Sequence, residues 1–451
     1  MKNLYLFLVC FISLNLSAQF WTEVAPFSNN ASFVPKQISI VDDNVVWVNG
    51  ASPLANSAQK WSRSLDSGLT WEEGTIDLGN AALQVSSIHA LSSEKAYVSA
   101  FSTDGITSGG VWVTTDGGAT WTQQTSALFN TPLESFPNFI HFFDNENGIV
   151  AGDPENGYFE LYTTTDGGQN WSRVPSQNIP AINAEEYGYS IKFEVRDNSV
   201  WFGTNKGRLF KSDDKGLNWV AHQTPLPDFS SGTIAGDFAF KNSNDGLLIS
   251  STWSIWKTTD GGANWTLMTN SANDQSCFNF DIERVPGTTD AYFAWGEKVA
   301  NGERSSTYSL NGGAFWDDLS NNIPNVLPIQ VKFKSSTIGF CIGNELLNSL
   351  ATKFYKLTDP LNVLGGTLSN VAFNNKLATV FPNPTQDFLR ISSNAIQEVA
   401  VADLDGKLLF DKQYSNLKET IVDISNFTSG IYIVKITLQD GISISEKIIK
   451  Y

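Results

Sequence analysis

The chain has few cysteines and histidines. Only three of each occur in 451 residues. So few cysteines and histidines disfavour a disulfide-rich scaffold, a histidine-rich metal site and a Ser-His-Asp triad. No CxxC or HExxH spacing occurs either, and we expect neither a metal nor a cofactor. Beyond the first 18 residues only Cys277 and Cys341 remain. The sequence does not decide whether these two cysteines form a disulfide, and two buried free thiols are the favoured interpretation.

Long apolar runs are missing beyond the N-terminus. Residues 1–18 contain Lys2, an apolar stretch over 4–14 and small residues at the end, which predicts a cleaved secretory signal peptide. The stretch is too short to span a bilayer. Cys10 is a poor site for lipid attachment because Val9 precedes it. We therefore expect an exported protein without membrane insertion.

Basic charge is scarce as well. The chain carries 29 Lys and Arg against 46 Asp and Glu, a formal net charge of −17 at pH 7. Such a surface repels nucleic acids and anionic membranes, so neither is an expected partner. Helical periodicity is absent, while aromatic residues reach 12% and glycine numbers 35. Short strands joined by tight turns, and hence an all-β fold, are predicted.

Tryptophan recurs at intervals of roughly 50 residues, which indicates one supersecondary unit repeated along the chain. Each unit divides into four short strands, as predicted for residues 189–196, 199–203, 208–212 and 218–221. Four strands in such a unit make one blade of a β-propeller. The seven tryptophans are Trp21, Trp71, Trp121, Trp171, Trp219, Trp265 and Trp316.

Six of these tryptophans end a turn of the pattern S/T-x-D-x-G-x-x-W, with Asn once in place of Asp. The short side-chain oxygen can accept N–H groups two residues on, and glycine permits positive φ. The pattern resembles the Asp-box (BNR) repeat of sialidases and sortilin-type receptors, which implies a structural role. A metal-binding or catalytic role is disfavoured because a ring disperses these side chains. They are Asp66, Asp116, Asp166, Asp214, Asp260 and Asn311.

The ends of the repeat region predict how the ring closes. Residues 20–24 resemble the fourth strands of other units, whereas the last unit, over 328–358, has only three strands. Pairing the N-terminal strand with these three gives seven four-stranded blades over residues 20–360 and leaves no exposed sheet edge. Six blades with loose ends are the alternative.

Residues 378–451 differ from the repeats, since they contain no tryptophan and alternate polar with apolar residues. Residues 361–377 are predicted to be a linker before them. The alternation and an Asp-Gly turn at 405–406 predict a small Ig-like β-sandwich.

Several phrases in this segment, at 380–384, 403–407, 423–425 and 430–435, resemble the type A C-terminal sorting domain of the type IX secretion system of Bacteroidetes. The resemblance implies that residues 378–451 engage the secretion machinery and direct export through the periplasm. The protein would then be released or attached to the outer-membrane surface. An accessory module that binds carbohydrate is the alternative.

In Asp-box propellers, ligands meet the face opposite the boxes, where the loops after the second and fourth strands lie. Acidic and aromatic residues in these loops could bind a sugar or a peptide through hydrogen bonds and ring stacking. An ordinary solvated loop is the alternative. The candidates are Asp153, Glu155, Glu185, Glu186, Tyr187, Tyr189, Asp228, Glu297 and Glu345.

Three classes of function fit this sequence. The favoured hypothesis is a monomeric, non-enzymatic binding or adhesion propeller for an extracellular glycan or protein. A glycoside hydrolase would need two carboxylates about 5–10 Å apart, and a sialidase would also need several arginines around the substrate carboxylate. A structural surface component is the third class. No residue is identified as catalytic, and the ligand is not indicated.

Overall fold

The computed structural model describes residues 21–27, 34–52, 57–131, 135–230, 234–268, 281–297, 304–318, 326–345, 352–357, 378–403, 407–438 and 443–451. The predicted signal peptide and linker lie outside these ranges, as does Cys277. The chain divides into two compact units, residues 1–365 and 366–451.

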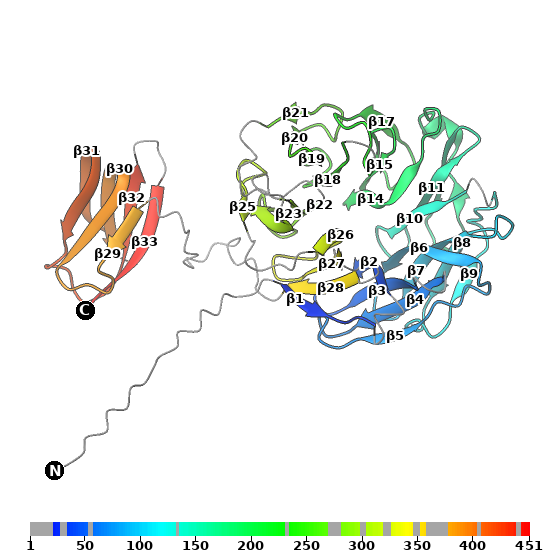
Figure 1. Ribbon diagram of the computed structural model, residues 1–451, viewed down its shortest axis with the longest axis horizontal. Coiled ribbons are helices and arrows are strands. Elements are labelled where there is room, and N and C mark those ends of the chain that lie inside the picture. Colours follow the sequence, from blue (N-terminus) through cyan, green and yellow to red (C-terminus); the bar gives the residue numbers. More distant parts are fainter. Residues whose placement is uncertain are drawn as a thin grey trace, which may run out of the picture. The chain divides into compact units, whose positions relative to one another are not determined.

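The first unit is a ring of seven sheets, each of four antiparallel strands (Figure 1). Blade 1 comprises β2 (Val34–Ile40), β3 (Val46–Ser52), β4 (Ser57–Ser64) and β5 (Glu72–Thr75). Blade 2 comprises β6 (Leu83–Ala90), β7 (Ala96–Ser102), β8 (Gly110–Thr114) and β9 (Thr122–Gln124). Blade 3 comprises β10 (Pro137–Phe142), β11 (Gly148–Glu155), β12 (Tyr158–Thr164) and β13 (Ser172–Arg173).

The remaining blades repeat this order. Blade 4 follows a 3-10 turn, η1 (Ser176–Asn178), and comprises β14 (Gly188–Arg196), β15 (Ser199–Thr204), β16 (Arg208–Ser212) and β17 (Val220–Gln223). Blade 5 comprises β18 (Gly236–Phe240), β19 (Gly246–Ser250), β20 (Ile255–Thr258) and β21 (Thr266–Leu267). Blade 6 comprises β22 (Asp281–Arg284), β23 (Tyr292–Glu297), β24 (Arg304–Ser309) and β25 (Asp317–Asp318). Blade 7 comprises β26 (Val326–Phe333), β27 (Gly339–Glu345), β28 (Thr352–Leu357) and β1 (Trp21–Val24).

The ring closes through the N-terminal strand. β1 pairs antiparallel with β28, from Trp21 opposite Leu357 to Val24 opposite Phe354. Trp21 is fully buried and packs edge-on against Phe293 of blade 6. The predicted seven blades and their closure by the N-terminal segment are therefore confirmed, and the alternative of six blades with loose ends is wrong.

Apolar contacts between neighbouring sheets form the cores of the ring. Between blades 3 and 4, for example, Phe139 stacks on Phe193 with ring centroids 4.4 Å apart, and Phe159 packs edge-on against Phe210. Because each sheet packs on both faces, β15 of blade 4 is buried along its whole length. Such double burial explains why the inner strands read as nearly continuous apolar runs.

The repeated turns are held by side-chain hydrogen bonds. In the turn at Asp116, the Thr114 hydroxyl accepts the Gly118 N–H at 2.8 Å, and the carboxylate accepts the N–H of Thr120 at 2.9 Å. The carboxylate therefore reaches four residues on, not two as predicted. Gly117 and Gly118 have φ of 72° and 92°, which only glycine adopts easily.

In four of the six turns the tryptophan has a polar role as well as an apolar one, whereas the Nε1 groups of Trp121 and Trp171 are buried without a hydrogen-bond partner among the described residues. The Nε1 groups of Trp71, Trp219, Trp265 and Trp316 donate to the carbonyl of their own turn's second glycine position at 2.8–3.2 Å. The predicted strand at 218–221 in fact begins after Trp219, at Val220. The ring of Trp219 is buried with the aromatic core of blade 4.

The second unit is a small β-domain built on two long strands. Its strands are β29 (Ala378–Phe381), β30 (Phe388–Asp403), β31 (Leu408–Asp423), β32 (Gly430–Leu438) and β33 (Ser443–Lys450). One half of β30 pairs with β29 and the other with β32, while β31 follows its opposite edge. Bulges near Ile396 bend β30 around one apolar core. This nearly closed sheet confirms the predicted sandwich-like domain.

Among the residues that the structure describes, no helix has the length and apolar character needed to cross a membrane.

Candidate ligand-binding site on the loop face

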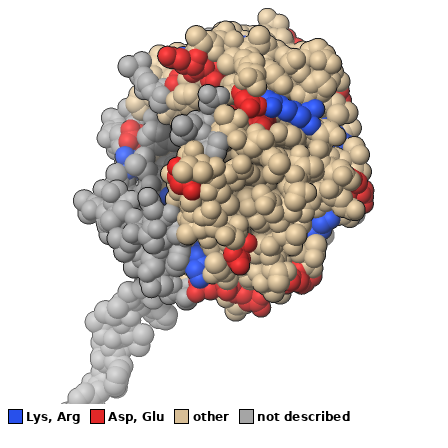
Figure 2. Space-filling model, turned by 90° about the vertical axis from the view of Figure 1, so that its right-hand side faces the viewer, with Lys and Arg blue, Asp and Glu red and all other residues tan. Residues whose placement is uncertain are grey.

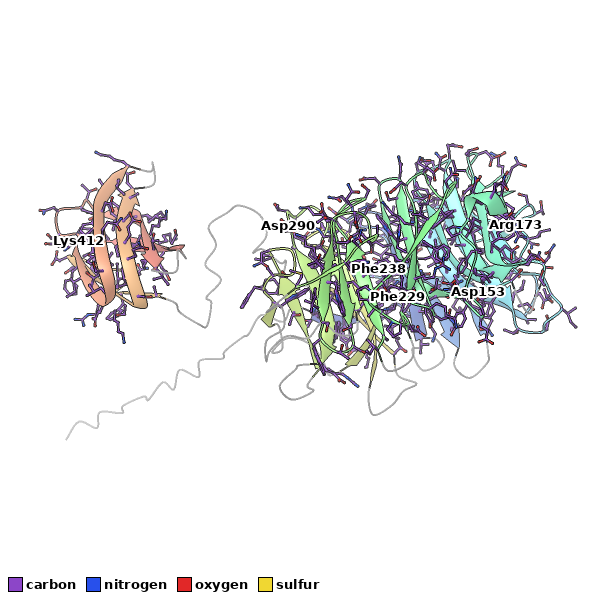
Figure 3. All side chains as sticks on the ribbon, turned by 90° about the horizontal axis from the view of Figure 1, so that it is seen from above. Asp153, Arg173, Phe229, Phe238, Asp290 and Lys412 are labelled. Atoms are coloured by element: carbon purple, nitrogen blue, oxygen red, sulfur yellow. The ribbon has the colours of Figure 1, made fainter. Side chains whose placement is uncertain are left out.

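The two faces of the ring are built from different connections. Loops after first and third strands, including the six repeated turns, lie on one face, which we call the turn face. Loops after second and fourth strands form the other, the loop face. Figure 3 shows Asp290 toward the turn face, and Asp153 and Phe229 toward the loop face.

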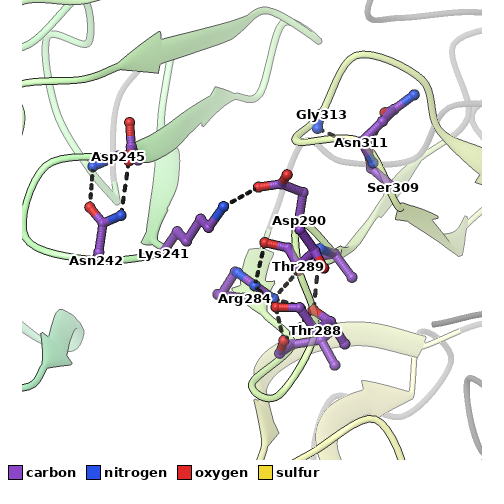
Figure 4. A network of polar contacts seen from close by, with 12 residues as sticks. Lys241, Asn242, Asp245, Arg284, Thr288, Thr289, Asp290, Ser309, Asn311 and Gly313 are labelled. Carbon is purple, nitrogen blue, oxygen red and sulfur yellow. Dashed lines mark hydrogen bonds and ion pairs between the residues drawn. The ribbon is translucent and has the colours of Figure 1, made fainter. Parts of the chain in front are cut away.

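An ion pair on the turn face joins neighbouring blades. Lys241, after β18, contacts Asp290, after β22, at 2.6 Å, and Arg284 donates to the backbone carbonyls of Thr288 and Thr289 beside it (Figure 4). The Lys241–Asp290 pair ties blade 5 to blade 6, and the Arg284 contacts hold the loop that carries Asp290. The candidates that the sequence predicts for ligand binding lie on the loop face.

Asp153 lies at the end of β11 and links blades 3 and 4. Its carboxylate accepts hydrogen bonds from Asn138 Nδ2 at 2.7 Å and from the Gly188 N–H at 2.9 Å. Burial outweighs these bonds and raises the pKa of Asp153 to about 6. A carboxyl group with this pKa could exchange protons near neutral pH, but both its bonds are internal.

Glu155 and Arg173 form a polar cluster near the outer edge of blade 3. Glu155 accepts a hydrogen bond from Thr131 at 2.7 Å and pairs with Arg173. Sequence reasoning missed Glu160, whose side chain is fully buried and accepts hydrogen bonds from Ser135 and Tyr162 at 2.5 and 2.8 Å. Burial raises the pKa of Glu160. Glu160 lies between the apolar residues Phe159 and Leu161 of β12. Such an alternation is typical of a polar side chain that points to solvent, so the sequence did not indicate that this carboxylate is buried.

The adjacent residues Glu185 and Glu186 have different environments. Glu186 is buried, and its carboxylate accepts hydrogen bonds from Thr204 at 2.7 Å and from Arg208 at 2.7 Å. It also accepts the Asn183 N–H at 2.8 Å, which closes the loop before β14. Glu185 is exposed and has φ of 57°. The structure thus brings Glu185, and not Glu186, to the solvent.

Two tyrosines stand beside this loop. Tyr187 exposes 42% of its surface and meets the ring of Tyr189 edge-on at a centroid distance of 5.5 Å. The Tyr189 hydroxyl donates to Asp228 of the next interblade loop at 2.7 Å, and Asp228 also accepts the Ser230 N–H. Four of the predicted residues, Glu185, Tyr187, Tyr189 and Asp228, therefore come together. We call this group the blade 4 platform.

A bulge in β14 carries this platform. The register passes from Gly188 opposite Thr204 directly to Phe193 opposite Phe202, so residues 189–192 face little more than Gly203. Blades 1, 2, 3 and 7 skip a single residue at the equivalent place. Bulges re-aim side chains beside functional sites. Ile191 within this bulge exposes 36% of its surface, which is unusual for an innermost strand.

Charged residues fill the central channel beside this bulge. A narrow pocket is lined by β14, β18, β22 and β26, and it contains Lys192 paired with Asp237 at 3.0 Å and Lys332 paired with Glu283 at 2.7 Å. Asp281 accepts the Val331 N–H at 2.8 Å. Burial raises the pKa of Asp281 well above its usual range, and neighbouring Asp237 raises it further.

Sequence reasoning missed this channel cluster, although the repeats contain a sign of it. One position of the innermost strand is polar in six blades, and it precedes an apolar residue each time. The residues are Gln37, Ser87, Lys192, Asp237, Asp281 and Gln330. Gln37, Ser87, Asp281 and Gln330 each accept an N–H from the next blade's innermost strand. Aligning the blades with one another would have identified this inner ring.

On the other side of the channel two histidines meet. His89 and His141 lie on the innermost strands of blades 2 and 3, with ring centroids 4.3 Å apart. Burial lowers the pKa of His89 to about 4, and burial and the nearby His89 lower that of His141. Both rings are therefore neutral at pH 7. No group of three or more His, Cys, Asp or Glu within the described ranges could hold a metal ion.

The remaining predicted residues lie in other blades. Glu297 ends β23 in blade 6 and accepts a hydrogen bond from Arg304 at 3.3 Å. Glu345 ends β27 in blade 7 with its backbone opposite Val326, and its side chain lies outside the described atoms. These two residues do not join the platform of blade 4. Cys341 is a buried free thiol.

Charge does not single out a site on the side of the ring drawn in Figure 2. Acidic and basic side chains are scattered there, and uncharged residues predominate between them. The platform is distinguished by the exposed ring of Tyr187 and by the irregular register of β14.

Two segments of the chain match known families. Residues 379–451 match the secretion system C-terminal sorting domain, and residues 105–225 match the photosynthesis system II assembly factor YCF48. These matches confirm a BNR-like propeller followed by a type IX sorting domain. The sorting domain indicates export to the cell surface or the medium and an interaction with the secretion machinery.

Curated relatives share parts of the propeller. Xyloglucanase Xgh74A of Acetivibrio thermocellus is 26% identical over 195 residues, which cover 35% of this chain and 22% of that protein. Photosystem II assembly lipoprotein Ycf48 of a Synechococcus species is 32% identical over 111 residues, which cover 25% of this chain and 30% of that protein. The matches thus span less than a third of either relative.

Solved structures share the ring itself. YCF48 bound to D1 peptide has a TM-score of 0.53 and 17% identity, covering 76% of this chain and 99% of that one. YCF48 from Cyanidioschyzon merolae has a TM-score of 0.51 and 15% identity, covering 75% of this chain and 98% of that one. At these identities the likeness shows the propeller fold.

Proposed function

We propose that this protein is an exported binding propeller that holds an extracellular glycan or protein on the blade 4 platform without changing it chemically. The observation that carries the proposal is the bulge of β14, which departs from the regular blade and places Tyr187 at the surface. Aromatic rings contribute large contact areas for sugars and peptides at low entropic cost.

Internal hydrogen bonds hold the platform in place before any ligand arrives. Tyr189 is fixed by Asp228, and Asn205 accepts the Tyr187 N–H at 2.9 Å and donates to the Glu185 carbonyl at 2.8 Å. A pre-organised surface loses little conformational freedom on binding, so more of the contact energy appears as affinity.

The acidic residues of the loop face support binding over hydrolysis. A glycoside hydrolase needs one carboxyl group to donate a proton and a second to act as base or nucleophile. Asp153, Glu155 and Glu186 each accept at least two internal hydrogen bonds or ion pairs. Their oxygens are engaged in holding loops and neighbouring blades together.

Hydrogen exchange on the full secreted protein tests the binding proposal. Wild-type protein is first screened on glycan and peptide arrays, and exchange is then measured with and without the tightest ligand. We expect added protection across residues 185–192 and 226–230. Protection confined to the turn face, around residues 116–120 or 311–316, would show that the ligand does not bind at the blade 4 platform.

A glycoside hydrolase is the second candidate, because xyloglucanases are among the curated relatives. Incubation with xyloglucan and measurement of new reducing ends separates the two. The binding proposal predicts no release above that of buffer. Steady release that survives repurification would replace it with a hydrolase.

The sorting domain supports a finer proposal about location. The chain crosses the periplasm and reaches the outside of the outer membrane, where it is released or attached to the surface. The signal-peptide composition of residues 1–18 supports the first of these steps.

A further inference from the structure

The C-terminal domain exposes an unusual amount of apolar side chain. Nineteen large apolar residues are exposed in the described part of the chain, and nine of them lie between Phe381 and Tyr451. The domain's own core is complete without them, since Leu389, Val399 and Val434 at its centre are fully buried. Exposed apolar residues gathered on one small domain mark a contact surface.

Strand register shows that three of these residues are neighbours. Phe381 of β29 lies opposite Arg390 of β30, and Arg390 lies opposite Ile421 of β31. Phe388 precedes Arg390 by two residues and therefore points to the same side of the sheet. Phe381, Phe388 and Ile421 are exposed by 48%, 49% and 57%.

A polar centre divides this apolar group. The Arg390 guanidinium lies 5.8 Å from the centroid of the Phe381 ring and pairs with Glu419 at 2.6 Å. Both charged side chains remain about half exposed, at 44% and 48%. Such a pair, surrounded by apolar residues, gives a docking surface its orientation more than its affinity.

A separate pair of exposed apolar residues lies on the last two strands. Thr385, which follows β29, bridges to β33: its N–H donates to the Ile449 carbonyl at 2.8 Å, and its carbonyl accepts the Tyr451 N–H at 3.1 Å. Ile449 lies opposite Ile431, and both side chains are exposed. The sorting face, as we call it, consists of Phe381, Phe388 and Ile421.

We propose that the sorting face docks onto an apolar surface of a folded protein of the export machinery. This inference rests on the sorting role, because a domain that matches a secretion sorting family must be recognised by another protein. A lipid surface fits less well. Residues 378–451 carry nine acidic and seven basic residues, and Arg390 is already paired, whereas membrane-surface binding is strengthened by a basic excess.

The test compares the double variant F381S/I421S with wild type in a host that has the secretion system. Fractionation measures how much full-length chain reaches the cell surface and the medium. We expect at least a tenfold fall in the exported fraction, with the chain retained in the periplasm. Because both residues are exposed, the melting temperature of the domain should stay close to that of wild type.

A matched control uses another exposed residue of the same domain. Leu408 is exposed by 54% at the opposite end of β31 from Ile421, and Leu408→Ser should export normally. Normal export of the folded double variant would overturn the proposal, as would an equal loss in Leu408→Ser. A wild-type dimer that F381S/I421S converts to monomer with export intact would also overturn it, because the face would then join two copies.

Deletion of residues 378–451 separates this proposal from the sorting role. If the deleted chain is still exported, the sorting role itself fails. If the deletion blocks export but F381S/I421S does not, only the docking face fails.

Discussion

At the scale of single residues, the environment shifts the pKa of aspartate side chains in opposite directions at different places in this ring. Hydrogen bonds from the Thr120 hydroxyl and N–H hold the pKa of Asp116 at about 2. Asp153 is enclosed, and burial raises its pKa to about 6. Turn aspartates therefore stay ionised at every physiological pH, while Asp153 changes its charge within that range.

Asp153 gives the propeller a pH-dependent stability. Its pKa is about 6 in the folded chain against an ordinary value of 3.8, so the folded state holds a proton that the unfolded state releases between these values. Its stabilising effect is complete below about pH 4 and is lost as pH rises through 6. We expect Asp153→Asn to be more stable than wild type at pH 8 by up to about 2 kcal/mol.

Chemical denaturation at pH 4 and pH 8 measures this difference. The advantage of the variant should shrink at pH 4, where the wild-type carboxyl is also uncharged. An advantage of equal size at both pH values would show that lost packing, and not protonation, governs the site.

The turn aspartates are expected to act on stability and not on ligands. Asp214 accepts the N–H groups of Leu217 and Asn218 at 3.1 and 2.8 Å. Asp214→Ala should lower the free energy of unfolding by about 1 kcal/mol, and ligand affinity should not change. Leu217→Ala, at an exposed position in the same turn, is the control. Loss of ligand binding at unchanged stability would contradict a structural role.

Residue-level prediction from sequence reached its limit at Glu185 and Glu186. Composition and position suggested both as ligand contacts, yet one is exposed and the other accepts three internal hydrogen bonds. Glu185 has a positive φ and lies within the turn that the Glu186 N–H closes on the Asn183 carbonyl. In a loop without period, no pattern in the sequence reports which side chain turns inward.

At the scale of elements, the innermost strands carry what is specific to this propeller. Alternation and turn residues predicted the four strands of blade 4 to within about two residues of β14 to β17. They could not reveal that β14 leaves the ladder before Phe193. A bulge changes pairing without changing residue type, so only the register shows it.

The ion pairs of the channel are expected to matter more than those on the surface. Glu283 and Lys332, in contact at 2.7 Å, have side chains exposed by 6% and 28%. Glu283→Ala should cost about 2–3 kcal/mol, since it leaves a largely enclosed cation without its partner. Lys241→Ala breaks a pair that is exposed by 33% and 41%, and should cost no more than about 1 kcal/mol.

Urea unfolding of both variants tests this ranking. Equal losses would show that water reaches the channel and screens its charges. A larger loss in Lys241→Ala would mean that blade docking on the turn face outweighs the inner network.

At the scale of the whole molecule, one period in the sequence was enough to predict the ring. Seven evenly spaced tryptophans and a last unit without a fourth strand required the N-terminal segment to close it, and β1 does so opposite β28. The ligand could not be predicted in this way, because its surface comes from loops and from one irregular strand. The repeated sequence pattern predicts the blades of the propeller, whereas the candidate site is formed by loops and by a strand, β14, that depart from this pattern.

The export step that follows entry into the periplasm is expected to depend on the C-terminal unit. The two units are separately compact, so removal of residues 378–451 should leave a folded propeller in the periplasm. Protease resistance and cell fractionation measure folding and location together. Surface display of the truncated chain would contradict the sorting assignment.

The affinity of two aromatic variants tests the binding account most directly. Tyr187 on the loop face and Phe315 on the turn face expose 42% and 53% of their surfaces, so their replacement by alanine removes comparable exposed rings. With the glycan or peptide that wild type binds most tightly, Tyr187→Ala should raise Kd at least tenfold and Phe315→Ala should leave it unchanged. An unchanged Kd in Tyr187→Ala, or an equal loss in both variants, would contradict binding at blade 4.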